Sequence, residues 1–507
     1  MIKDDFYRDS IILTVSNLVA GILRFMFSIL LSRKLGAEGM GLYSLVMPIY
    51  DLFTCLICGG MVTAISKESS SYYGINDYGN LNKSIHTALV FDFVLAIFIT
   101  ILVFFLSPYI STYIIKDQRT LYSLWVICPA LIFVALSSIY KGYFYGISNV
   151  KVPAIIDIVE KTARMAIILG LINFFALTNV TTTVTATYIS LSIGELISFI
   201  LLYVFYEKSK NKFKVIIKKT EGRAQLLFNV LIVSFPLCLN GFLNTVISAL
   251  STLIVPGRLV QAGIEYTESL SLIGKFSGMA MSIVFFPFII VMSMSTMLTP
   301  DISKSIIKND YNALENRIHE VIKISFLLGI STMIICLCIG SSLGKLFFDR
   351  YDLGIYIRLA ALSAPFMYMS GSTFGILNGL GKQKALLINS VVTSIIQLVL
   401  LYILLGIPSI NILGYGIALL ISSILSAIMN IVSIEKCCYI DFSGSEFLID
   451  ICLSILLYFI LKILSNTIPD SIFITKNIII IVTGFSLLLF SLILTKKSEK
   501  SKAHHTR

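Results

Sequence analysis

Fourteen runs of about twenty predominantly apolar residues, separated by polar segments, dominate this chain. A helix needs about 20 such residues to cross the hydrocarbon core of a bilayer, since it rises about 1.5 Å per residue. The pattern therefore predicts an all-α polytopic membrane protein with about 14 transmembrane helices. The approximate spans are 11–32, 40–65, 85–107, 121–144, 152–176, 182–206, 226–250, 270–297, 318–340, 355–377, 384–406, 411–434, 447–465 and 473–495.

The composition agrees with a bilayer as the solvent. Hydrophobic residues make up 57% of the chain and charged residues only 13%, against roughly 25% charged in soluble domains. The excess of basic residues gathers between apolar runs, as in "EKSKNKFKVIIKKTEGR" at 207–223 and "KKSEKSKAHHTR" at 496–507. This is the positive-inside pattern of a membrane protein. It predicts that both termini are cytoplasmic and that nucleic acid is not a partner.

A sequence repeat divides the chain. "NDYGNLNKSIH" at 76–86 recurs as "NDYNALENRIH" at 309–319, with six of eleven residues identical at an offset of 233. An even number of helices per repeat predicts two six-helix lobes of the same topology, a plan used by alternating-access transporters. We expect lobes at 1–220 and 221–440. Residues 441–507 then hold two additional transmembrane helices and a basic cytoplasmic tail.

The fifth apolar run carries four charges within eight positions: Asp157, Glu160, Lys161 and Arg164. Asp157 and Lys161 are four residues apart, as are Glu160 and Arg164, so each acid is expected beside a base. Each charge costs about 2.5–3.5 kcal/mol at mid-membrane on insertion scales, which disfavours a lipid-facing position. We therefore expect this face to line a wet chamber between the lobes.

The repeat predicts the opposite wall of that chamber. Adding 233 to residues 156, 160 and 164 gives Asn389, Thr393 and Gln397. Their spacing of four residues places them on one face of a helix. The second lobe is thus expected to present neutral polar groups where the first presents ions.

Further charges interrupt other apolar runs or border them. They are Arg24, Asp51, Glu195, Arg258 and Lys275. Three interpretations of the combined set stay open. Arg24, Lys161, Arg164, Arg258 and Lys275 would bind an anionic head group, for which the planar fork of arginine is well suited. Alternatively, the set is a self-neutralising network that locks helices together, or Asp157 and Glu160 couple transport to protons or cations.

The nine cysteines form no disulfide or metal framework in the sequence. Cys55 and Cys58 have C-x-x-C spacing, but they lie in an apolar run without further ligands nearby, so we interpret them as small core residues. No cofactor and no metal are expected. A lipid-linked glycosyltransferase would need a D-x-D pair, which the chain lacks, so an enzyme is not expected either.

Several segments together resemble a known family. They are "SRKLGAEGMGLYSLVMPIYDLF" at 32–53, "DQRTLYSLWVICPA" at 117–130, "SSIYKGYFYGISNVKVPA" at 137–154, "IVEKTAR" at 158–164 and "IGELISFILLY" at 193–203. They are similar to bacterial polysaccharide flippases of the multidrug/oligosaccharidyl-lipid/polysaccharide exporter superfamily. The family's Glu-Gln-x-x-Arg motif matches at Glu160 and Arg164, whereas Lys161 departs from it. Arg24 lies about one turn from the usual basic position in the first helix.

The resemblance implies a function in the bacterial cytoplasmic membrane. The cargo would be an undecaprenyl-pyrophosphate-linked peptidoglycan precursor of the lipid II type, moved by alternating access for spore cortex synthesis. The two additional helices would form a groove for its lipid tail. Expected partners are this lipid-linked oligosaccharide, membrane lipids and enzymes of cell-wall synthesis, and the protein is expected to be a monomer. A flippase for another lipid-linked polysaccharide, a cation-coupled multidrug exporter and a scaffold of cell-wall synthesis remain alternatives.

Overall fold

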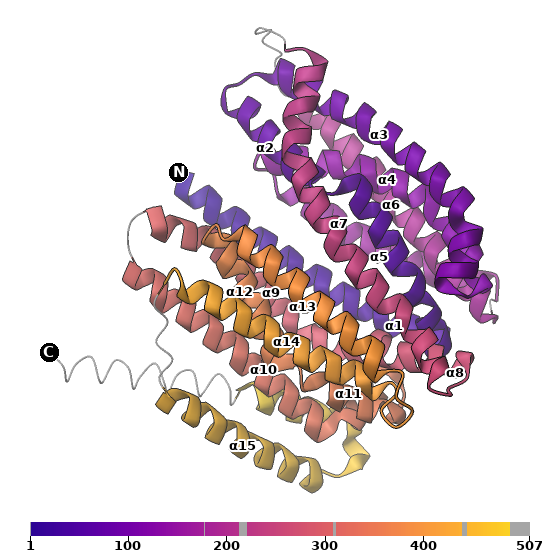
Figure 1. The fold of residues 1–507 in the computed structure, drawn as a ribbon. Helices are drawn as coiled ribbons and strands as arrows, with labels where there is room; N and C mark the ends of the chain where they lie inside the picture. Colours follow the sequence, from indigo (N-terminus) through magenta and orange to yellow (C-terminus); the bar gives the residue numbers. More distant parts are fainter. Residues whose placement is uncertain (1, 177, 212–220, 308–310, 439–443, 487–507) are drawn as a thin grey trace, which may run out of the picture. The chain divides into compact units, whose positions relative to one another are not determined.

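The structure, a computed structural model, describes residues 2–176, 178–211, 221–307, 311–438 and 444–486. Within these ranges all regular structure is helical (Figure 1). Each of the fourteen predicted runs corresponds to a helix, a helix half or a bent helix pair, and the last is described as far as Ser486. The prediction of an all-α polytopic membrane protein is confirmed.

The chain forms two compact units. Unit 1 comprises Met1–Gly257 and Tyr266–Gly274, and unit 2 comprises Arg258–Glu265 and Lys275–Arg507. The elements of unit 1 are α1 (Ile2–Cys58), α2 (Met61–Gly74), α3 (Tyr78–Tyr109), η1 (Ile110–Ile115), η2 (Gln118–Thr120), α4 (Leu121–Gly146), α5 (Lys151–Phe174), α6 (Val180–Lys210), most of α7 (Arg223–Gln261) and α8 (Tyr266–Ile273). Within unit 1, α4 packs between α3 and α6, and α5 packs against α1 and α6 (Figure 1).

Unit 2 contains the remaining helices. They are η3 (Gly274–Ala280), α9 (Met281–Ile307), α10 (Tyr311–Phe348), η4 (Tyr351–Leu353), α11 (Gly354–Ala361), α12 (Ala364–Gly379), α13 (Gln383–Leu404), α14 (Leu413–Glu435), α15 (Gly444–Thr467), η5 (Asp470–Ile472) and a last helix, Phe473–Ser486. Within unit 2, α12 packs against α9, α10 and α14, and α13 packs against α14. The axes of α11 and α12 are bent by 52°, so one predicted helix is a broken span.

The first two predicted helices are the two halves of α1. They meet at Gly36, whose φ of 68° is a left-handed conformation that glycine adopts at little cost. The second predicted helix was expected to continue to residue 65, but it ends at Cys58. A second glycine, Gly60, has a φ of 75°, and α2 starts directly after it. Ser234 of α7 lies so close to Gly60 that a side chain would collide with its backbone.

Helix α7 packs with the helices that precede it. The Cys238 thiol donates a hydrogen bond to the Cys55 carbonyl oxygen at 3.5 Å, and the Asn229 amide donates to Glu68 at 3.3 Å. The sequence repeat, in contrast, starts the second lobe at residue 221. The lobe boundaries at 220 and 440 therefore stay a prediction, while packing assigns α7 to unit 1 up to residue 257.

The α3 helix has one exposed apolar face and one buried face. Val94, Phe98 and Phe105 are exposed, whereas Ala96 and Ile99 on the other side are buried. A large apolar surface left exposed along a helix of this length is one that lipid tails solvate. The buried side packs against α4, so the core of unit 1 lies on the inner faces of its spans.

Candidate functional site

Helix α5 carries an acid in the middle of its buried stripe. Ile156, Ile168 and Ile172 are buried at spacings of four or a multiple of four, and Glu160 occupies the same stripe with only 5% of its surface exposed. Because residues four apart share one face of a helix, the burial of these isoleucines carries Glu160 inward. A carboxylate in such a position needs partners to offset the loss of its hydration.

Those partners come from two helices. Arg164, one turn along α5, donates a hydrogen bond to Glu160 and another, at 3.2 Å, to Glu195 of α6. The Lys161 ammonium lies 3.4 Å from the second oxygen of Glu160. The predicted Glu160–Arg164 pair is therefore confirmed, and Glu195 joins it.

Asp157 has a different partner from the one predicted. Its carboxylate pairs with Lys141 of α4 at 2.7 Å. Lys161 instead points its ammonium at Glu160 and, at 3.5 Å, at the Asp157 backbone carbonyl. The expected Asp157–Lys161 ion pair is wrong, because α4 supplies a closer base that sequence spacing along α5 alone does not reveal.

We call these six residues the charge cluster: Lys141, Asp157, Glu160, Lys161, Arg164 and Glu195. It contains three bases and three acids, so its formal charge is zero. Gly194 of α6 makes room for it, since a Cβ there would lie 3.0 Å from the Glu160 carboxylate and 3.3 Å from Arg164 Nε. Within the described structure Arg164 Nε is buried and has no hydrogen-bond acceptor. The cluster ties α4, α5 and α6 together and retains one unused donor.

The other charges predicted for the site in unit 1 do not join the cluster. Arg24 and Asp51 are both exposed side chains on α1. Neither forms a hydrogen bond or ion pair with another residue in the described part of the chain. Both remain open to an external ligand, and neither is positioned by a protein partner.

The two bases predicted in unit 2 have partners of their own. The Arg258 guanidinium donates to the Tyr402 carbonyl at 2.7 Å, bonds Gln261, and stacks 4.1 Å from the centre of the Tyr402 ring. Lys275 pairs with Asp352 at 2.9 Å. Asp352 also accepts hydrogen bonds from Arg350, which raise the pKa of Arg350. These contacts anchor Arg258 and Lys275 near helix ends.

The three residues predicted for the opposite wall take part in a neutral polar network and a cavity. The Asn389 amide donates to Asn430 at 3.0 Å and to Ser433 at 3.1 Å, both on α14. Asn430 in turn donates to Thr373 of α12 at 3.1 Å. Thr393, which is buried, donates to the Asn389 carbonyl. Asn389 and Thr393 therefore join the helices of unit 2 without any charge.

Thr393 and Gln397 also line a cavity of about 370 Å³ within unit 2. Its walls combine serines with apolar side chains. They are Phe288 and Met292 of α9, Met367, Ser370, Gly371 and Phe374 of α12, and Leu419, Ser422, Ser423 and Ser426 of α14. The cavity is mildly polar and carries no charge, in agreement with a second wall of neutral groups. Its place relative to the charge cluster stays a prediction.

Two family comparisons match the chain. Residues 6–306 match the family described as polysaccharide biosynthesis protein, and residues 276–403 match the MatE family. The first match spans more than half of the sequence. The chain belongs to the polysaccharide biosynthesis protein family.

Relatives of this polysaccharide biosynthesis protein extend over most of its length. It is 24% identical over 462 residues to stage V sporulation protein B of Bacillus subtilis, covering 91% of this chain and 89% of the relative. It is 21% identical over 415 residues to the lipid II flippase MurJ of the same organism, covering 78% and 76%. The resemblance to polysaccharide flippases drawn from the sequence segments is confirmed.

Solved structures show the same fold. Lipid II flippase MurJ in an inward closed conformation matches with a TM-score of 0.72 and 14% identity over 97% of this chain and 99% of that one. An inward-facing multidrug resistance MATE family transporter of the MOP superfamily matches with a TM-score of 0.66 and 13% identity over 84% and 99%. The polysaccharide biosynthesis protein thus has the fold of MOP superfamily transporters.

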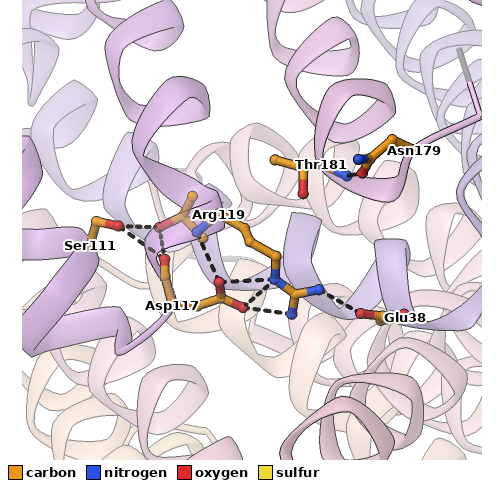
Figure 2. Close-up of polar contacts among 7 residues, drawn as sticks. Glu38, Ser111, Asp117, Arg119, Asn179 and Thr181 are labelled. Atoms are coloured by element: carbon orange, nitrogen blue, oxygen red, sulfur yellow. Dashed lines mark hydrogen bonds and ion pairs between the residues drawn. The ribbon is translucent and has the colours of Figure 1, made fainter.

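One of the segments that carry this family resemblance contains an ion-pair cluster that was not predicted from the sequence. Figure 2 shows Arg119 of η2 reaching Glu38 of α1 at 2.6 Å and Asp117 at 2.8 Å, while Ser111 donates to the Asp117 carbonyl. Asn179 caps α6 by accepting from the Thr181 amide. The alternation of acid and base in "DQR" gave a signal for a local pair, but the contact with Glu38 depends on the bend of α1 at Gly36.

The described residues contain no group of three or more His, Cys, Asp or Glu that could hold a metal ion. Cys55 and Cys58 are both free thiols. Asp92 of α3, which is fully buried, is not among the residues predicted for the site.

Proposed function

We propose that this protein is a flippase that moves an undecaprenyl-pyrophosphate-linked peptidoglycan precursor of the lipid II type across the bacterial cytoplasmic membrane, for synthesis of the spore cortex. Transport proceeds by alternating access and requires no catalysed bond change. The partners in this proposal are the lipid-linked oligosaccharide, membrane lipids and cell-wall synthesis enzymes, and the protein acts as a monomer with both termini in the cytoplasm.

The extent of the fold match is the observation that carries the proposal. The lipid II flippase MurJ aligns over 97% of this chain, whereas the MATE transporter aligns over 84%. This chain has two helices beyond the twelve of its repeats. We expect it to align over more of its length with a protein that also has two such helices. In our proposal these helices, α15 and Phe473–Ser486, hold the lipid tail.

The charge cluster supports an anionic cargo. A pyrophosphate group offers several acceptor oxygens, and arginine can donate two parallel hydrogen bonds to such a group. Lys161 is held by the longest of the cluster's ion pairs, at 3.4 Å, and 27% of its side chain is exposed. We therefore assign the first contact with the head group to Lys161, followed by Arg164.

The carboxylates regulate that contact in our proposal. Glu160 and Glu195 share the guanidinium of Arg164, and two like charges at one base repel each other. Protonation of one of them, or its displacement by pyrophosphate, frees a hydrogen-bond donor of Arg164 for the cargo. The cluster then alternates between an internally neutral state and an anion-bound state.

Two alternatives use the same fold. A flippase for a different lipid-linked polysaccharide would use the same bases, because the pyrophosphate linkage is common to such carriers. A multidrug exporter of the MATE type would need an excess of acids to receive cations, and the cluster has equal numbers of acids and bases. Export of cationic dyes from cells distinguishes the second alternative.

Complementation tests the proposal. Cells depleted of their essential lipid II flippase receive wild type, Arg164→Ala, Glu160→Gln or Lys161→Gln, and membrane levels of each variant are measured. Wild type is expected to restore growth and Lys161→Gln, at equal level, to fail. A matched control is Lys210→Gln, which breaks an exposed ion pair with Glu207 on α6 and should rescue fully.

Two outcomes would contradict the proposal. Equal rescue by wild type and by all three cluster variants would remove the charge cluster from transport. Failure of a well-expressed wild type to rescue would exclude lipid II as the cargo and favour a different lipid-linked glycan or a scaffold.

A further inference from the structure

Asp92 lies near the middle of α3 and is completely buried. It belongs to the inward stripe of α3, where Ala88 and Ala96 occupy the neighbouring turns. Within the described structure neither of its carboxylate oxygens has a hydrogen-bond partner. An acid with both oxygens orphaned inside a helix bundle differs from every member of the charge cluster.

The groups around Asp92 come from the helices packed against α3. The face of α2 in this core is apolar, with Met61, Ala64 and Ile65. From α1 the Cys58 thiol is the titratable group close enough to Asp92 for an electrostatic interaction. On α4, the Ser138 hydroxyl donates to the Ala135 carbonyl oxygen at 2.7 Å. Among the described residues no lysine or arginine donates a hydrogen bond to the Asp92 carboxylate.

These surroundings favour the uncharged acid. An ionised carboxylate loses its hydration on burial, and nothing here replaces that hydration with a base or a hydrogen-bond donor. Ionisable residues inside membrane spans commonly mark ion pathways or proton relays. Purely structural packing would be served equally well by asparagine or an apolar residue at this position.

We propose that Asp92 is a proton-binding site of unit 1. It holds a proton on its carboxyl group inside the membrane, and releases that proton to water when a conformational change of unit 1 hydrates α3. A proton needs only one carboxylate, whereas a bound metal cation needs several ligands, and no group of three or more acidic, histidine or cysteine ligands exists among the described residues. This site is independent of which cargo the protein carries.

Infrared spectroscopy of the full-length protein in lipid tests the site directly. The carboxyl C=O stretch of protonated acids is recorded from pH 5 to pH 10 for wild type, Asp92→Asn and Asp51→Asn. Asp51 is an exposed acid on α1 and serves as the matched control. At pH 7 we expect a protonated-acid band in wild type and in Asp51→Asn that is lost in Asp92→Asn.

Each outcome of the infrared experiment either supports or overturns the proposal. Identical carboxyl bands at pH 7 in wild type and Asp92→Asn would overturn the proposal. A band that sodium chloride removes at constant pH, while choline chloride does not, would assign the site to sodium and also overturn it. If Asp92→Asn does not accumulate, Asp92→Glu replaces it, and the band should then shift in frequency; an unshifted band would overturn the assignment.

Discussion

Helices α5 and α13 occupy corresponding positions of the sequence repeat, yet α5 contacts its neighbours through charged groups and α13 through neutral polar groups. On α5, Glu160 and Arg164 belong to a cluster of six charges drawn from three helices. On α13, Asn389 and Thr393 use only amide and hydroxyl groups. Neutral groups can be buried singly once hydrogen-bonded, whereas buried charges need several partners. The comparison indicates that unit 1 has kept a costly arrangement that unit 2 shows to be unnecessary for the fold.

We expect the largest loss of stability from a substitution of Arg164. Arg164→Ala would leave Glu160 and Glu195 facing each other without the base that they share. Breaking a buried ion pair typically costs about 3–5 kcal/mol, so we expect a loss of this size in the free energy of unfolding in mixed detergent micelles. The control is Lys210→Ala, which breaks an exposed pair and should cost under about 1 kcal/mol. Equal losses in the two variants would contradict the buried, coupled state of the cluster.

The second effect tests the neutral network of unit 2. Asn389→Ala would remove the donor that joins α13 to Asn430 and Ser433. Leaving a buried neutral acceptor without a partner costs about 1–3 kcal/mol, so the loss should be smaller than at Arg164. The same measurement of the free energy of unfolding tests this prediction. A loss as large as that of Arg164→Ala would show that the two units do not differ in the way described.

Lys141 lies at the edge of the charge cluster, and its substitution tests whether the edge contributes less to stability than the centre. Lys141→Ala would release Asp157, of which 29% of the side chain is exposed, so water can hydrate the freed carboxylate. We expect a loss of about 1 kcal/mol. If thermal unfolding shows a loss comparable with that of Arg164→Ala, Lys141 is part of the cluster's centre rather than its edge.

Lys161 should have the smallest effect on stability. Its ammonium is partly exposed and forms the longest pair, so Lys161→Gln is expected to change the free energy of unfolding by under about 0.5 kcal/mol. Circular dichroism melting checks this. A clear loss of stability would argue that Lys161 locks helices and does not await a ligand.

The helical fold could be predicted from the sequence because the length and periodicity of the apolar runs are local properties of the chain. Gly36 and Gly60 explain where the predicted boundaries moved, since chain breaks depend on single positive-φ residues that hydropathy does not register. The Glu160–Arg164 pair was accessible from spacing along one helix. Lys141 and Arg119 were not, because their partners Asp157 and Glu38 lie on other elements. Asp92 is a single acid in an apolar run, as Asp51 and Glu195 are, so its presence could have been noted from the sequence. Its lack of a partner could not be predicted, because that depends on the helices packed around it.

Transport by purified protein tests the central claim most directly. Wild type, Lys161→Gln and Lys210→Gln are reconstituted in vesicles with a fluorescent undecaprenyl-pyrophosphate-linked glycan, and its movement between leaflets is followed by quenching from outside. We predict that wild type and Lys210→Gln move the lipid and that Lys161→Gln loses at least tenfold in rate while melting at the wild-type temperature, tenfold being about 1.4 kcal/mol. Equal rates for Lys161→Gln and wild type would contradict the assignment of the charge cluster to the anionic head group.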